Sequence, residues 1–144
     1  MDTLTPEQRS ERMSRVRGKN TKPEMAVRSL AHRLGYRFRL HRSDLPGKPD
    51  LVFPSRRKAI FVHGCFWHRH PNPGCKLARL PKSRRDFWIP KLEGNRQRDL
   101  RDQAKLNAMG WNSLVIWECQ VREREWLKER ITGFLSGNAR GLDG

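Results

Sequence analysis

Hydrophobic and polar positions along the chain follow first a helical and then an extended pattern. Thr21 with Glu24 forms a helix-start signal, and apolar side chains recur at helical spacing until Gly35. Three strands are predicted next, one from strict alternation and two from short apolar runs, over 36–41, 50–53 and 59–63. The N-terminal half is therefore predicted to form one helix followed by three strands.

The C-terminal half begins with an irregular stretch and then becomes periodic again. Residues 64–90 show no clear period and hold Gly, Pro, Trp and most of the histidines. Beyond them the pattern predicts a helix, a buried strand and a last helix, over 95–109, 111–118 and 123–135. Asn95 is the expected cap of the first helix, and one of its faces is expected to hold Leu100, Ala104 and Ala108. The element order predicts an α/β fold with one mixed central sheet flanked by helices.

Composition narrows the class of protein. The 144 residues suit one domain, and 31 Lys and Arg against 15 Asp and Glu give a formal net charge of +16. Such an excess of positive charge repels itself within a compact domain, and binding of a polyanion offsets this repulsion. No stretch approaches the roughly 20 apolar residues of a membrane span, and residues 1–9 contain no hydrophobic signal segment. We therefore expect a soluble, cytoplasmic protein that binds nucleic acid, with no membrane partner.

Three cysteines and several histidines suggest a metal site. Cys65, His70 and Cys75 are spaced five residues apart in the irregular stretch, and Cys119 follows the last predicted strand. Three thiolates and one imidazole are a recognised ligand set for structural zinc. The alternative is three ordinary buried thiols with a surface histidine. The pattern alone leaves open which imidazole would bind, because His68 lies two residues from His70.

A carboxylate and two further histidines suggest phosphodiester chemistry. Asp50 begins a predicted strand, and His63 and His68 lie near the end of the next one. This arrangement resembles the metal-binding half of a nuclease core, in which a carboxylate holds Mg²⁺ and an imidazole moves a proton. The alternatives are structural: Asp50 as a turn residue, His63 satisfied by backbone, and Glu24 as the capping-box partner of Thr21.

Large aromatic residues sit beside basic ones. Phe66 and Trp67 precede His68, and Trp88 follows a basic run at 82–85. Aromatic side chains next to cations suit stacking on bases or wedging between base pairs. The alternative is that they pack over the zinc loop as a small second core. Three other tryptophans on periodic elements are expected in the core, at Trp111, Trp117 and Trp126.

Several of these motifs together resemble one enzyme family. Six segments match the very short patch repair (Vsr) mismatch endonucleases in order and spacing, at 13–24, 45–50, 61–70, 84–88, 98–99 and 117–119. The resemblance runs from about residue 8 to residue 136. It implies a restriction-endonuclease-like α/β core. It also implies Mg²⁺-dependent nicking of duplex DNA on the 5′ side of the mispaired T in T·G mismatches, which arise when 5-methylcytosine deaminates.

The resemblance also implies roles for individual residues. Asp50 and the main-chain oxygen of Val62 would bind Mg²⁺, and His68 would activate the attacking water. His63 and Glu24 would order metal-bound waters. Structural Zn²⁺ would be held by Cys65, His70, Cys75 and Cys119, and the duplex would be wedged open by Phe66, Trp67 and Trp88. Two departures from the family pattern are Val62, where Thr is common, and a longer link between His70 and Cys75.

The expected organisation is a basic DNA-contacting arm over 1–20, a single endonuclease domain over 21–137 and a tail over 138–144. We expect a monomer, because one T·G lesion lacks two-fold symmetry. A MutL-type repair partner and association with a bacterial nucleoid are also expected. Two other hypotheses compete: a related restriction-type nuclease without mismatch specificity, and a non-enzymatic, zinc-stabilised nucleic-acid-binding module.

Overall fold

A four-stranded mixed sheet forms the centre of the molecule, whose computed structural model describes residues 21–137. The predicted arm over 1–20 and tail over 138–144 lie outside the described residues. The strands are adjacent in chain order and are β1 Arg39–Leu40, β2 Leu51–Phe53, β3 Lys58–His63 and β4 Asn112–Trp117. The first three are antiparallel, and β4 pairs parallel to β3. The predicted fold class, a mixed sheet flanked by helices, is confirmed.

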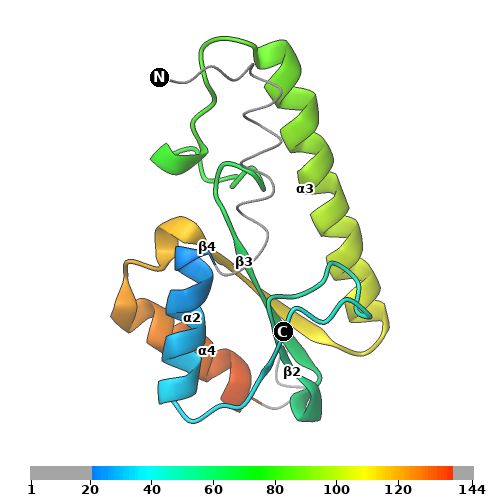
Figure 1. The fold of residues 1–144 in the computed structure, drawn as a ribbon, viewed down its shortest axis with the longest axis vertical. Coiled ribbons are helices and arrows are strands. Elements are labelled where there is room, and N and C mark those ends of the chain that lie inside the picture. The colour runs from blue at the N-terminus through cyan, green and yellow to red at the C-terminus, as the bar shows by residue number, and fades with distance from the viewer. Residues whose placement is uncertain (1–20, 138–144) are drawn as a thin grey trace.

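Two helices cover one face of the sheet. Figure 1 shows α2 (Lys22–Arg33, blue) beside α4 (Arg124–Ser136, orange to red). Thr21 caps α2, and its hydroxyl oxygen accepts the Glu24 N–H at 3.3 Å. Their apolar faces meet the sheet in a buried cluster that holds Val27, Leu30, Ala31, Leu51, Phe53, Ile60, Leu114, Ile116, Leu127, Ile131 and Leu135. Both helices were predicted from their apolar spacing, and both are confirmed.

The opposite face of the sheet packs against the C-terminal part of α3. Alternate residues of β2 and β3 point there, in a second cluster made of Leu45, Val52, Ala59, Phe61 and Leu106. Successive side chains of a strand face opposite sides, so the two short strands contribute to both clusters. Packing on both faces thus holds β2, which Asp50 immediately precedes, and β3, which contains Val62.

Helix α3 is longer than predicted. It runs over Arg85–Ala108 and contains Pro90, whereas the sequence pattern predicts a start at Asn95. Proline removes one backbone hydrogen bond and normally ends a helix, but packing outweighs that cost here. Asn95 is not a cap; it is buried inside α3, and its side-chain amide donates to the Trp67 carbonyl at 3.0 Å.

Three smaller predictions are also corrected. The predicted buried face of this helix is exposed, with Leu100 49% accessible, because α3 turns Leu92, Asn95 and Leu106 inward instead. The predicted strand over 36–41 reduces to the two residues of β1. Trp126 is exposed and not part of the core.

Within the part of the chain that the structure describes, we find no helix with the length and apolar character needed to cross a membrane.

Candidate active site and metal centre

Asp50 is positioned by the hairpin of β2 and β3. It immediately precedes β2, and its backbone N–H donates to the Ile60 carbonyl at 3.1 Å. Its Oδ2 accepts the backbone N–H of Val62 at 2.7 Å. Burial raises the pKa of Asp50 to about 7; the nearby Glu24 carboxylate also raises it, while the Val62 hydrogen bond and His41 act in the opposite direction. A buried carboxylate with this environment favours a bound cation or a proton.

His68 is held by a carboxylate from α3. Its Nδ1 lies 2.6 Å from Oδ2 of Asp99, and its ring stacks on His63 with a centroid distance of 3.9 Å and an interplanar angle of 5°. His63 ends β3 and meets the Trp117 ring edge-on at 5.2 Å. A carboxylate on Nδ1 fixes the ring orientation and favours the tautomer in which Nε2 accepts a proton.

Asp50 and His68 line the same cavity. It has a volume of about 190 Å³ and is lined by Gly47, Lys48, Asp50, Phe61, Val62, His63, His68 and Asp99. Gly47 has φ +78°, and a Cβ there would lie 3.0 Å from both the Phe61 ring and Asp102. Glycine therefore lets the 45–49 turn approach the cavity closely. The cavity brings together a carboxylate suited to a divalent cation and an imidazole suited to proton transfer.

The Glu24 side chain faces His41, while the Glu24 backbone takes part in the N-terminal cap of α2. The Glu24 carboxylate is 2% exposed and lies 2.5 Å from Nε2 of His41 and 3.5 Å from Arg28. One ligand atom each from Glu24, His41 and Asp50 falls within 4.8 Å of the others. The capping interpretation therefore explains the backbone N–H of Glu24, which Thr21 caps. It does not explain the surroundings of the Glu24 carboxylate.

Sequence reasoning missed the parts that His41 and Asp99 play. His41 was read only as the end of a strand, and Asp99 only as part of a family motif. No sequence signal identifies His41, because the burial of Glu24, which requires a hydrogen-bonding partner, is seen only in the structure. No local pattern links Asp99 to His68, since the two residues lie 31 positions apart.

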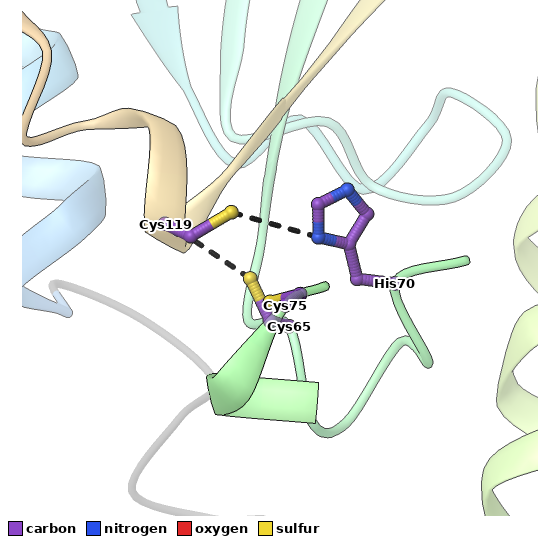
Figure 2. Close-up of side chains that lie close together, drawn as sticks. All are labelled: Cys65, His70, Cys75 and Cys119. Carbon is purple, nitrogen blue, oxygen red and sulfur yellow. Dashed lines mark hydrogen bonds between the residues drawn. The ribbon is translucent and has the colours of Figure 1, made fainter. Parts of the chain in front are cut away.

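The three cysteines and His70 form a second cluster, away from His68. Figure 2 shows Cys65, His70, Cys75 and Cys119 converging, and one ligand atom from each lies within 4.8 Å of the others. Cys65 follows β3, Cys75 precedes a 3-10 turn at Lys76–Ala78, and Cys119 lies in another at Glu118–Gln120. The structure thus groups His70, not His68, with the thiols, although their order in the chain left both open.

The distance between Cys119 and His70 in this cluster fits a tetrahedral metal. Zn–S bonds of about 2.3 Å and Zn–N bonds of about 2.05 Å place tetrahedral ligands about 3.6 Å apart, and Sγ of Cys119 lies 3.6 Å from Nδ1 of His70. The Cys119 N–H donates to Sγ of Cys65 at 3.4 Å (Figure 2), which favours a thiolate there.

The ionisation of these ligand side chains also favours a cation. Burial lowers the pKa of His70, which favours the neutral ring that a metal ligand requires. Burial raises the pKa of both Cys65 and Cys119. A multiply charged cation would be needed to hold their sulfurs as thiolates, and zinc does this.

Four aromatic residues gather between the cluster of three cysteines with His70 and the N-terminal end of α3. Phe66, Trp67 and Trp88 meet edge-on with ring centroids 5.1 to 5.9 Å apart, and Phe87 adds a further contact to Trp88 at 5.0 Å. Trp67 is 7% exposed, whereas Phe66 and Trp88 are half-buried. Arg84 stacks over Phe87 at 5.4 Å, so the cluster carries positive charge at its edge.

The mixed sheet and the helices that flank it form a restriction-endonuclease-like fold. A structural match supports this fold: the catalytic domain of the homing endonuclease I-Bth0305I superposes with a TM-score of 0.55 at 16% identity, covering 80% of this chain and 94% of that one. Residues 1–73 match the model of the family "DNA mismatch endonuclease Vsr". The chain belongs to the Vsr family and is a nuclease that acts on DNA.

Two named relatives agree with the assignment of this chain to the Vsr family. The type II nicking enzyme V.XorIIP of Xanthomonas oryzae pv. oryzae is 57% identical over 134 residues, which cover 93% of this chain and 96% of the relative. The DNA mismatch endonuclease Vsr of Escherichia coli is 40% identical over 121 residues, which cover 84% of this chain and 76% of the relative. The similarity to V.XorIIP therefore extends over nearly the whole chain.

Proposed function

We propose that this protein nicks duplex DNA on the 5′ side of the mispaired T in a T·G mismatch, as the first step of very short patch repair. The observation that carries the proposal is that Asp50 and His68 line one cavity in a chain of the Vsr family. The names of two relatives, a DNA mismatch endonuclease and a nicking enzyme, support the mismatch substrate and the cutting of one strand.

Magnesium fits the surroundings of Asp50. The Asp50 carboxylate is largely buried, a second carboxylate at Glu24 lies nearby, and Mg²⁺ prefers such oxygen ligands. Asp50 and the main-chain oxygen of Val62 would hold the ion, with Glu24 and His63 ordering waters around it. When bound, Mg²⁺ would neutralise charge on the scissile phosphate and favour ionisation of a nearby water.

His68 would act as the general base. Asp99 orients the ring through Nδ1, so Nε2 would accept the proton of the water that attacks phosphorus. The P–O bond to the 3′ oxygen would then break, leaving a 5′-phosphate on one side of the nick, and the departing oxygen would take a proton from solvent to give a 3′-hydroxyl on the other. The stacked His63 ring holds His68 in place and lines the same cavity, so it would also contact the phosphate or its water shell.

Zinc would have a structural role at Cys65, His70, Cys75 and Cys119. A closed four-ligand site leaves no position for water, so it holds chain segments together and does no hydrolysis. It would tie the irregular loop to the turn after β4 and so fix the aromatic cluster. Phe66 and Trp88, packed against the buried Trp67, would wedge into the duplex beside the mismatch, where the weakened stack opens at lower cost than a paired one. A monomer suits this single, asymmetric lesion.

The test is a nicking assay on a labelled duplex with one T·G pair, beside the matched T·A duplex. We expect Mg²⁺-dependent cutting of the T strand only in the mismatched duplex, and loss of cutting without loss of binding in Asp50→Ala. Equal cutting of both duplexes would instead support the related restriction-type nuclease. Tight, salt-sensitive binding with no Mg²⁺-dependent cutting would leave only the nucleic-acid-binding module.

A further inference from the structure

Asp50 takes part in two groups of side chains, and the proposed reaction uses only one of them fully. With His63, His68 and Asp99 it lines the cavity described above. With Glu24 and His41 it forms a separate group in which one ligand atom from each residue lies within 4.8 Å of the others. His41 has no part in the proposed hydrolysis, although it contacts a buried carboxylate at 2.5 Å.

The backbone holds His41 beside Asp50. The His41 N–H donates to the Asp50 carbonyl at 3.2 Å, where the chain leaves β1 and approaches β2. His41 has φ +49°, a left-handed conformation that a non-glycine residue adopts at some energetic cost. Its ring is 18% exposed, and it reaches Glu24 from 17 positions along the chain. The imidazole is therefore placed by tertiary structure, between two carboxylates from different elements.

The charge and geometry of this group suit a divalent cation. Two carboxylates face one imidazole, and Arg28, 3.5 Å from Glu24, is partly exposed. Bonds of about 2.1 Å place neighbouring octahedral ligands about 3.0 Å apart and opposite ones about 4.2 Å apart. The 2.5 Å contact would open by about half an ångström. The ligand atoms lie within 4.8 Å of one another, so reaching the distance of opposite ligands requires a closing movement of no more than about 0.6 Å, which side-chain rotation allows.

We propose that His41 and Glu24 both bind the cation at Asp50 directly, so that Glu24 does more than order metal-bound waters, and that the site therefore binds Mn²⁺ more tightly than Mg²⁺. Imidazole nitrogen is a poorer ligand for Mg²⁺, which keeps its water shell and prefers oxygen. Ions further along the divalent series accept nitrogen more readily. The inference rests on the proposed function, because it takes Asp50 as the metal ligand, but it is measured without DNA and without nicking.

The test is electron paramagnetic resonance of Mn²⁺ added to the full-length, zinc-saturated protein. The signal of free Mn²⁺ gives its dissociation constant, and competition with Mg²⁺ gives that of Mg²⁺ in the same sample. Spin-echo modulation then reports whether nitrogen is bonded to the bound ion. We expect directly bonded nitrogen in the wild type and its loss in His41→Gln. We also expect Mn²⁺ affinity to fall by about tenfold or more and Mg²⁺ affinity by less than about threefold in this variant.

His32→Gln is the matched control, because His32 is exposed on the same helix as Glu24, and it should change neither affinity nor the nitrogen signal. Circular dichroism and zinc content confirm that each variant is folded. Bound Mn²⁺ without bonded nitrogen in the wild type overturns the proposal, as does equal loss of Mn²⁺ and Mg²⁺ affinity in His41→Gln, which would make His41 only a positioning residue for Glu24. Undetectable Mn²⁺ binding also overturns it. Failure of T·G nicking alone would instead reject the proposed function.

Discussion

Asp99 lies 2.6 Å from Nδ1 of His68, and this contact joins α3 to the turn that follows β3. The pair places one imidazole in the cavity that also holds Asp50. Its arrangement is the one by which a carboxylate fixes the tautomer of a general base. The first prediction tests this relationship directly.

Replacing Asp99 by Asn keeps the shape of the side chain and removes its charge. The amide would favour the wrong tautomer of His68, so we expect single-turnover nicking to fall by about a hundredfold or more. The affinity for the mismatched duplex should change by less than about threefold. Asp102→Asn, one helical turn further along α3, is the control and should nick at close to the normal rate. Normal nicking by Asp99→Asn would show that His68 is not held as a base by this carboxylate.

The stability of the Mg²⁺-free protein should fall as pH rises through the ionisation of Asp50. Its pKa is about 7 in the folded chain and 3.8 when unperturbed, so the folded state retains a proton that the unfolded state loses. Between those values the free energy of unfolding should decrease by up to about 1.4 kcal/mol per pH unit from this group. Above pH 7 its contribution should be constant.

Comparison with Asp50→Asn isolates this contribution, since asparagine does not ionise. We expect the wild type to lose stability relative to the variant between about pH 5 and pH 6.5 in urea titrations without Mg²⁺. Added Mg²⁺ should reduce the difference because it binds the ionised carboxylate. Parallel curves for the two proteins would show that Asp50 ionises at its ordinary pKa.

The two neighbouring histidines should differ in their effect on zinc. His70 lies among the three cysteines, whereas His68 contacts Asp99. We expect about one zinc per chain in the wild type and in His68→Ala, and much less in His70→Ala. The latter should also melt more than about 10 °C lower, because a structural zinc site contributes directly to folding. Retention of zinc by His70→Ala with loss in His68→Ala would reverse the ligand assignment.

Trp88 should contribute to mismatch recognition if the aromatic cluster is a wedge. Stacking of one aromatic ring on a base contributes about 1–3 kcal/mol, so Trp88→Ala should bind the T·G duplex about 5- to 150-fold more weakly. Trp126→Ala is the control, since Trp126 is exposed on α4 and lies outside the aromatic cluster. Fluorescence anisotropy on T·G and T·A duplexes measures both. Unchanged T·G affinity in Trp88→Ala would assign this ring to packing alone.

Short-range patterns were sufficient for most of the fold. The helices α2 and α4 and the strands β2, β3 and β4 were predicted near their observed bounds, because apolar period and end signals act over a few neighbouring residues. The early part of α3 was not predicted. Pro90 disfavours a helix locally, and the contacts that offset it, such as that of Asn95 with Trp67, come from 28 positions away.

The sequence by itself determined the chemical inventory: an excess of cations for a polyanion, three thiols, five imidazoles and motifs of one nuclease family. The family motifs implied that His70 joins the three thiols, but only the tertiary structure showed His68 beside Asp99 and His41 beside Glu24. His68 pairs with Asp99, His41 with Glu24 and His70 with Cys119, across 31, 17 and 49 positions. Such contacts depend on sheet register and helix packing, which bring distant residues together, and residue spacing along the chain carries no record of them.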